Sequence, residues 1–352
     1  MDLRKGLGAL RKVVEKPSRI DLHIHSAAST LTKDAGNKSL EECNAGNIAV
    51  LLKSLESYGV NVCAITDHDI FDYELYKTLK SYEGVGSLEL VLPGIEFSVE
   101  LNEATGSNSV IHIVAVFDDA DDRKVSHIRD HLVGSDGKPR YNNKNKSAFT
   151  EDGLEIILRN IDLDVVLIGH EKSAGRGSKR DISSLDNATV NDVILTEFVD
   201  AVEIRNRHKE LDIKHLIDTY PRDDVPFILG SDCHDWAVYP LKDASMKGRE
   251  SELAFSSIKS LPTFRGLVMA ITDHSRIKVV VCRKLVSSIP ARAAGLEPAR
   301  AAGRRPEPSA FYTTITQPSQ ASPRWRPLRR PSPSRPRRRA PGRGRAPTCG
   351  RP

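Results

Sequence analysis

Seven short apolar runs lie between residues 19 and 234, and they carry His, Asp or Glu within them or at their ends. The runs are RIDLHIH, VCAITDH, VLPGIE, VIHIVAVF, VVLIGH, AVEIRN and FILGSDCH. Short apolar runs rich in Val and Ile predict buried strands, and amphipathic stretches lie between them. The repeated order of strand and helix favours an α/β fold with a parallel sheet, either open or closed into a barrel.

Three stretches outside the runs predict helices. In residues 39–59, Ser39 and Glu42 have the spacing of a capping box, and Gly59 suits the C-terminal cap. Residues 207–220 and 250–271 are further helical candidates because their apolar residues recur at helical spacing.

Charge divides the chain into parts of different character. Residues 286–352 contain 15 Arg, two Glu and no Lys or Asp, so their net charge is +13. Because the whole chain has a net charge of +5, residues 1–285 have a net charge of −8. Thirteen of the twenty prolines also lie there. We therefore predict an N-terminal extension over 1–17, a folded barrel over 18–285 and a disordered Arg/Pro-rich tail over 286–352. The tail is either an inert or foreign terminus, which we favour, or a non-specific binder of nucleic acid.

The remaining composition predicts a cytoplasmic protein with no membrane partner. No stretch approaches the roughly 18 to 20 uncharged apolar residues of a membrane span, and the N-terminus lacks the apolar core of a signal peptide. The five cysteines show no CxxC spacing and are odd in number, which favours free thiols in a reducing compartment.

Histidines and carboxylates at strand ends predict a metal centre. Strand C-termini of a parallel α/β barrel meet at one mouth, so ligands that are far apart in sequence can lie together there. His23 and His25, like Asp232 and His234, are two residues apart, which places both members of each pair on one face of an extended strand. Mixed imidazole and carboxylate ligands suit zinc, manganese or iron. More than four such ligands indicate more than one ion, and Glu96 or Asp232 could bridge two of them.

Six of these segments resemble the motifs of the PHP (polymerase and histidinol phosphatase) family of metal-dependent phosphoesterases. They are DLHIHS, ITDHD, PGIEFS followed by IHIVAVF, IGHEK and GSDCH, in the family's order. The resemblance implies a distorted (β/α)7 barrel with two or three divalent ions at the strand C-termini. It assigns the metal ligands to His23, His25, His68, Glu96, His112, His170, Asp232 and His234. Asp21 and Asp67 would orient imidazoles by hydrogen bonds.

The chain departs from the family pattern at one place. Many members carry another His or Asp ligand a few residues after the first motif, where this chain has Leu31, and Asp34 is a candidate substitute. Within the family, the motifs look most like the PHP module that begins TrlF-like ATPase proteins. The chain has no G-x-x-x-x-G-K-[ST] phosphate loop, so this kinship implies that the ATPase half is absent, that the Arg/Pro-rich tail stands where it would begin, and that an ATPase is a possible partner.

Basic residues follow His170 in a loop of small residues. Lys172, Arg176 and Arg180 are candidates for binding a substrate phosphate, with a plain solvated loop as the alternative. Glu203 and Asn206, at the end of AVEIRN, are expected to line the mouth without binding metal.

The function predicted from these residues is hydrolysis of a phosphate ester by metal-bound hydroxide. We expect His68, Asp232 and His234 to take part in catalysis and assist the leaving oxygen. The substrate is a phosphorylated small molecule or, by preference, a nucleotide or nucleic-acid end. The alternatives are a catalytically weak module that regulates an ATPase, and nucleic-acid binding through the tail.

The tetrapeptide Ile-Thr-Asp-His occurs twice, at 65–68 and at 271–274. The first copy ends a strand-like run, which places His68 with the other candidate ligands. The second follows Phe264, Leu267, Val268 and Ile271 at helical spacing, which predicts that His274 lies on the surface at the end of a helix.

Overall fold

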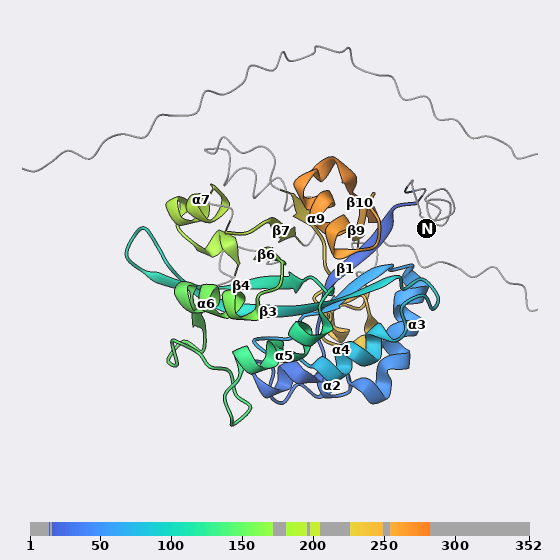
Figure 1. Cartoon of the computed structure of the whole chain (residues 1–352), viewed down its shortest axis with the longest axis horizontal. Coiled ribbons are helices and arrows are strands. Elements are labelled where there is room, and N and C mark those ends of the chain that lie inside the picture. Colours follow the sequence, from blue (N-terminus) through green and yellow to red (C-terminus); the bar gives the residue numbers. More distant parts are fainter. Residues whose placement is uncertain are drawn as a thin grey trace, which may run out of the picture. The chain divides into compact units, whose positions relative to one another are not determined.

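The computed structural model describes residues 14, 16–171, 181–195, 198–204, 226–248 and 254–281. The predicted tail, 286–352, and nearly all of the predicted extension, 1–17, lie outside these ranges. Ten strands form one sheet, drawn in Figure 1. They are β1 (Ser18–Ile24), β2 (Val62–Ile65), β3 (Leu90–Asn102), β4 (Asn108–Phe117), β5 (Phe149–Thr150), β6 (Val165–Glu171), β7 (Ala201–Ile204), β8 (Phe227–Ile228), β9 (Ala254–Ile258) and β10 (Ile277–Val281).

Seven of these strands form a nearly closed barrel in the order β1-β2-β3-β4-β6-β7-β8. The chain after β8 returns to β1, where the backbone N of Asp232 donates to His23 O at 2.8 Å and the N of His25 donates to Cys233 O at 2.9 Å. All seven predicted runs are strands of this barrel. The prediction of a mixed α/β fold with a distorted seven-stranded barrel is therefore confirmed.

We had expected a parallel sheet, but some of its strands are antiparallel. Strand β4 runs antiparallel to both of its neighbours, β3 and β6. Strand β9 is antiparallel to β1 and β10 is antiparallel to β9. The short connection between β3 and β4, residues 103–107, explains the reversal, because it leaves no room for the crossover that a parallel pair needs.

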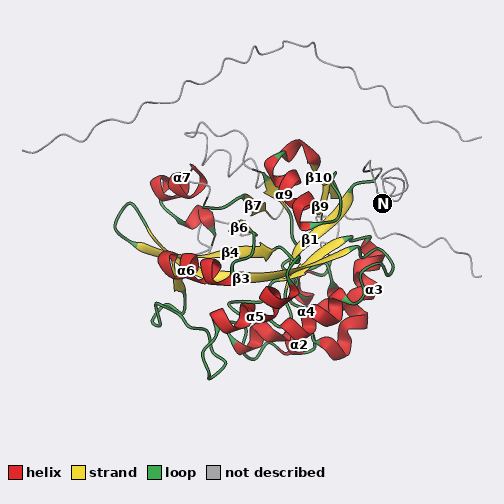
Figure 2. Cartoon of the chain, in the orientation of Figure 1, coloured by secondary structure: helices red, strands yellow, loops and turns green. Residues whose placement is uncertain are grey.

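Helices surround the barrel (Figure 2). They are α2 (Lys38–Glu41), α3 (Ile48–Tyr58), α4 (Tyr73–Lys80), α5 (Asp122–Leu132), α6 (Glu151–Ile161), α7 (Asn187–Leu195) and α9 (Phe264–Thr272). Short 3-10 helices include η1 (Ala27–Leu31), η2 (Ala45–Asn47) and η4 (Trp236–Val238). No helix in the described part of the chain is long and apolar enough to cross a membrane.

Two of the helix predictions need correction. The stretch 39–59 is not one helix: α2 begins after an Asn37 cap, and the side chain of Asn44 caps η2 before α3 begins. The predicted Ser39–Glu42 capping box is therefore wrong, whereas Gly59 is the predicted cap, with a left-handed φ of 62°. Residues 250–271 also divide, into strand β9 and helix α9, because Pro262 and the Thr263 cap start the helix late. The candidate at 207–220 lies outside the described residues.

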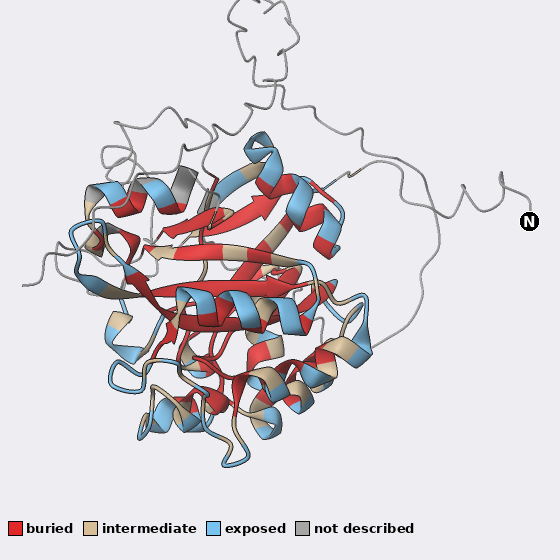
Figure 3. Ribbon diagram, turned by 60° about the vertical axis from the view of Figure 1, so that its left-hand side comes forward, coloured by how far each residue is buried: buried red, intermediate tan, exposed pale blue. Residues whose placement is uncertain are grey.

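The apolar core has two layers, on opposite faces of the barrel wall. Inward-facing residues such as Leu22, Ala64 and Val114 pack with Phe264 and Leu267 of α9 at the end where the parallel strands begin. Outward-facing residues pack under helices α3 to α6, whose outer faces are exposed (Figure 3). The opposite end of the barrel interior is lined by polar residues instead.

Alternation along each strand places those polar residues. In β3 the inward positions are Leu90, Leu92, Gly94 and then Glu96, so an apolar half leads into a ligand at the mouth. Strand β1 directs its ligands to the mouth only because its register shifts between Asp21 and Ile24. Two residues separate Asp21 from Ile24 on β1, whereas one residue separates their partners Cys63 and Ile65 on β2, so β1 contains one extra residue there.

The bulge re-aims the end of β1. Before it, Leu22 joins the inner core; after it, Ile24 packs in the outer layer. His23 and His25 therefore point to the mouth, as their two-residue spacing predicted. Strand β1 therefore contributes Ile20 and Leu22 to the inner core and carries the first two candidate ligands at its C-terminal end.

Candidate metal centre

The eight predicted metal ligands come together at the mouth of the barrel. Their ligand atoms form four overlapping groups of three, and within each group these atoms lie within 4.8 Å of one another. The groups are His25, His68 and His234; His23, His25 and Asp232; His23, His170 and Glu203; and His68, Glu96 and His112. We refer to these nine residues as the mouth cluster. All of them except His170 are at least nine-tenths buried.

Glu96 lies between four imidazoles. Its Oε2 is 2.9 Å from His68 Nδ1, 3.2 Å from His23 Nε2 and 3.3 Å from His25 Nε2. Its Oε1 is 2.8 Å from His112 Nδ1. A carboxylate with both oxygens directed at different imidazole groups has the placement of a bridging ligand.

His112 reaches the cluster because β4 is antiparallel. It pairs with Ser98 in the first half of its strand, not at the C-terminal end. We expected it to reach the mouth as a ligand at the end of a parallel strand, so its place is as predicted but the reason was wrong. The reversed strand brings its N-terminal half to the same mouth.

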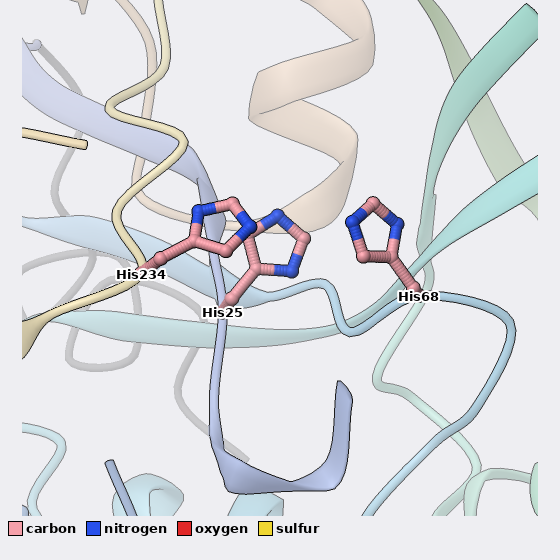
Figure 4. Close-up of side chains that lie close together, drawn as sticks. All are labelled: His25, His68 and His234. Carbon is pink, nitrogen blue, oxygen red and sulfur yellow. The ribbon is translucent and has the colours of Figure 1, made fainter. Parts of the chain in front are cut away.

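Three histidines from distant segments face one another in Figure 4: His25 at the end of β1, His68 after β2 and His234 after β8. The ring centroids are 4.1 Å apart for His25 and His234 and 4.6 Å apart for His25 and His68. Asp34 Oδ2 lies 3.5 Å from His68 Nε2 and 3.9 Å from His234 Nε2. Asp34, the candidate substitute in the family comparison, therefore contacts this group, whereas Leu31 is 61% exposed.

Carboxylates hold the outer nitrogens of two other histidines. Nδ1 of His23 lies 2.6 Å from Glu203 Oε2, and Nδ1 of His170 lies 2.6 Å from Asp181 Oδ1. A carboxylate on Nδ1 fixes the ring so that Nε2 is free to bind metal. Glu203 also belongs to one of the groups that could hold a metal ion, together with His23 and His170.

Asp232 does not lie on an extended strand. Strand β8 ends at Ile228, and Asp232 has a left-handed φ of 52°. The reason given for pairing Asp232 with His234 was therefore wrong. The bend directs Asp232 Oδ1 to within 3.4 Å of both His25 Nε2 and His234 Nδ1. A left-handed conformation costs less for Asp than for most other residues, and such strain is common at functional sites.

Lys242 was not predicted. Its Nζ is 2.7 Å from Asp232 Oδ2, and its side chain is 48% exposed at the edge of the cluster. Although burial opposes the charge, Asp232 and the nearby Glu96 and Asp34 raise the pKa of Lys242, so the ammonium stays protonated. No sequence pattern marks a lysine eight residues after the last motif, and Asp181 is equally unmarked.

Electrostatics keep Glu96, His112 and His234 in the forms that metals bind, whereas Glu96 raises the pKa of His68 although burial opposes this. Burial would raise the pKa of Glu96, but His68, His112 and His23 hold it well below its usual value, so Glu96 is a carboxylate. Burial lowers the pKa of His112 to about 4 despite Glu96, and burial together with His25 lowers that of His234 to about 2. These two imidazoles are therefore neutral at physiological pH, as ligation requires.

The two predicted orienting carboxylates differ in what they bind. Asp67 contacts His25 through Ser29, whose Oγ lies 2.8 Å from Asp67 Oδ1 and 3.2 Å from His25 Nδ1. Asp21 accepts hydrogen bonds from the backbone N of Ser231 and from Tyr239 OH. It therefore anchors the loop that carries Asp232 and His234.

Some of the predicted binding residues are not described. Lys172, Arg176, Arg180 and Asn206 lie outside the described residues. The second Ile-Thr-Asp-His copy is placed as predicted: α9 ends at Thr272, and His274 is exposed in the following 3-10 helix.

The donor set fits divalent metal ions. Glu96 Oε2, His68 Nδ1 and Asp34 Oδ2 are buried and have no hydrogen bond of acceptable geometry, although Glu96 Oε2 and His68 Nδ1 are only 2.9 Å apart. His23 Nε2 and His25 Nε2 are 3.0 Å apart. Buried imidazole and carboxylate atoms that lie this close together without a well-formed hydrogen bond are typical of metal sites, and this mixture of ligands suits zinc, manganese or iron.

Comparison with known proteins adds only distant similarities. No family model matches the chain, and no curated protein matches it. A provisionally assigned metal-dependent phosphoesterase from Bifidobacterium adolescentis is 13% identical, and the match covers 66% of this chain and 95% of that one, with a TM-score of 0.40. PsfC from Pseudomonas syringae is 14% identical over 71% of this chain and 85% of that one, with a TM-score of 0.35. The function proposed below rests on the geometry of the site.

Proposed function

We propose that this protein is a metal-dependent phosphoesterase whose active site is the mouth cluster. The observation that carries the proposal is the position of Glu96, whose Oε1 lies 2.8 Å from His112 Nδ1 and whose Oε2 lies within 3.3 Å of nitrogens of His68, His23 and His25. This placement suits a carboxylate shared by two divalent ions. Two such ions, when bound, would supply Lewis acidity and lower the pKa of bound water, as phosphate ester hydrolysis requires.

The protein's own residues would transfer a proton to the leaving oxygen and attract the substrate phosphate. His68 and His234 both lie next to Asp34. Because Glu96 raises the pKa of His68 against the effect of burial, we assign the proton for the leaving oxygen to His68, and His234, whose pKa is lowered, would act as a neutral ligand. Asp232 connects the ligands to Lys242, whose half-exposed ammonium can attract an anionic phosphate. We propose a phosphorylated small molecule or a nucleic-acid end as the substrate, because the acidic body of the protein does not favour long nucleic acids.

The test compares the two Ile-Thr-Asp-His copies. Metal content and hydrolysis of a panel of phosphate monoesters and diesters are measured on the full chain with His25→Ala, Asp232→Ala, His68→Ala and, as matched control, His274→Ala. We expect the first three to lose bound metal and at least about 100-fold in hydrolysis, because each removes a ligand from the cluster. His274→Ala should retain both.

Equal metal content and equal hydrolysis in all variants would refute the proposed site. Metal binding that depends on these residues, without hydrolysis of any ester in the panel, would favour the alternative of a structural or regulatory module.

A further inference from the structure

The hydroxyl of Ser29 lies at a junction beside the mouth cluster. Ser29 belongs to η1 and is fully buried. Its Oγ is 2.8 Å from Asp67 Oδ1, 3.0 Å from the backbone N of His68 and 3.2 Å from His25 Nδ1. One hydroxyl therefore contacts both of the first two ligand motifs.

The three contacts use every hydrogen-bonding position of that hydroxyl, which has one proton and two lone pairs. The backbone N of His68 can only donate, so it uses one lone pair. Asp67 Oδ1 already accepts from the backbone N of Ser26 at 2.6 Å, so it is an acceptor and receives the Ser29 proton.

Asp67 is the acceptor in its contacts with both serines. The backbone N of Ser26, which can only donate, lies 2.6 Å from Oδ1, and the hydroxyl of Ser26 donates to Oδ2 at 2.6 Å. Since the hydroxyl of Ser29 also donates to Oδ1, Ser29 has only a lone pair left for His25.

The second lone pair of Ser29 must accept a proton from His25 Nδ1. A neutral imidazole carries one ring proton, so Nε2 of His25 then has the lone pair. That nitrogen lies 3.3 Å from Glu96 Oε2 and 3.4 Å from Asp232 Oδ1. It therefore faces the centre of the cluster in the form that binds a metal.

We propose that Ser29 is a positioning residue that sets the tautomer of His25 and thereby prepares Nε2 as a metal ligand. The proposal rests on the metal centre of the proposed function but concerns the metal-free ring. Neighbouring histidines are held by groups that only accept: Glu203 for His23, Asp181 for His170 and the backbone O of Asp232 for His234. The partner of His25 Nδ1 is a hydroxyl, which can donate or accept. Because Ser29 donates its proton to Asp67, it can only accept from His25, and this fixes the tautomer of His25.

The first test is a ring ¹⁵N NMR spectrum of the metal-free full chain with labelled histidine, recorded at mildly alkaline pH, above the usual imidazole pKa of about 6.5. The His25 signals are assigned by their loss in His25→Gln. We expect a protonated Nδ1 and an unprotonated Nε2 in the wild type. A proton on Nε2 would overturn the proposal, whether or not the protein hydrolyses phosphate esters.

The second test measures the tautomer and the zinc affinity, by competition with a chelator, in Ser29→Ala, Ser29→Thr and Thr30→Ala. Thr30 is the matched control because its hydroxyl, in the same 3-10 helix, donates to Ala27 O at 2.6 Å, away from the cluster. We expect Ser29→Ala to lose the single Nδ1–H tautomer and to bind zinc about 10- to 100-fold more weakly, the usual effect of removing a group that orients a ligand. Ser29→Thr should restore both, and Thr30→Ala should match the wild type.

An unchanged tautomer or an unchanged zinc affinity in Ser29→Ala would each contradict the proposal. If Ser29→Ala does not fold, the wild-type spectrum and Ser29→Thr decide. None of these readouts depends on catalysis, so a failure of the proposed function is recognised separately.

Discussion

At the scale of single residues, the cluster combines many carboxylates with few cations. Glu96, Asp232, Asp34 and Glu203 contact its histidines, whereas the cation that contacts one of these carboxylates in the described part of the chain is Lys242. The Asp232 carboxylate lies between this ammonium and His25, so it would offset the repulsion that bound divalent ions exert on Lys242, whose side chain is 48% exposed. Lys242 therefore has the charge and exposure to bind substrate phosphate.

We predict that Lys242→Met raises KM for a phosphate ester about tenfold, the equivalent of one charge-assisted hydrogen bond, while kcat changes less. Steady-state kinetics and metal content together check this, with Lys247→Met as the control because Lys247 is an exposed lysine on the following loop. Lys242→Arg should retain most of the affinity because it keeps the charge. Unchanged KM in Lys242→Met would exclude Lys242 from substrate binding, and loss of metal would assign it to holding Asp232.

At the scale of elements, close approach of strand ends is what brings the ligands together. Gly230 follows β8, and a Cβ there would lie 2.1 Å from Glu203 Oε1 and 2.8 Å from His23 Cβ. The latter atom is next to the backbone of β1 and has little freedom to move. Glycine at 230 therefore allows β7, β8 and β1 to close the barrel around the cluster.

We predict that Gly230→Ala lowers the melting temperature of the metal-free protein and weakens metal binding. The reason is that the added methyl displaces His23 or Glu203, an overpacking that usually costs about 1 to 3 kcal/mol. Gly46→Ala is the control, because Gly46 lies in η2 on the exposed side and a Cβ there would meet only Asn44 Oδ1, at 3.1 Å. Thermal denaturation and chelator competition measure the two effects. A Gly230→Ala protein that resembles Gly46→Ala would show that this contact does not hold the site.

At the scale of the whole molecule, charge is distributed very unevenly. Residues 1–285 carry −8, and the Arg-rich residues 286–352 carry +13. The mouth cluster is composed entirely of residues from the acidic part. Catalysis and any attraction to nucleic acid should therefore be separable.

We predict that deleting residues 286–352 leaves metal content and ester hydrolysis unchanged. Any salt-sensitive binding of DNA or RNA by the full chain should be lost with the tail. Such binding depends on salt because Arg side chains neutralise phosphates and release the counterions bound to the nucleic acid. Filter binding at several salt concentrations and hydrolysis assays on both forms measure this. Hydrolysis that is lost with the tail would contradict the separation.

Sequence alone was sufficient for the seven strands and for the set of histidines and carboxylates at their ends. Both depend on local patterns: apolar runs form buried strands, and alternation decides which side chains face inward. Helix boundaries were less certain, since Asn44 and Pro262 interrupt apolar periods that otherwise look continuous. The capping residue at Gly59 was found because a left-handed cap needs little more than a glycine at the right place.

The tertiary structure decided the direction of β4, the left-handed bend at Asp232 and the partners of each imidazole. None of these follows from local pattern, because each depends on which distant segments lie side by side. Asp181, Lys242 and Ser29 have ordinary sequence neighbourhoods, and they matter only through contacts with His170, Asp232 and His25. The sequence alone shows which residues are of a type that can bind a metal. Their orientation and protonation depend on contacts between segments that are distant in sequence.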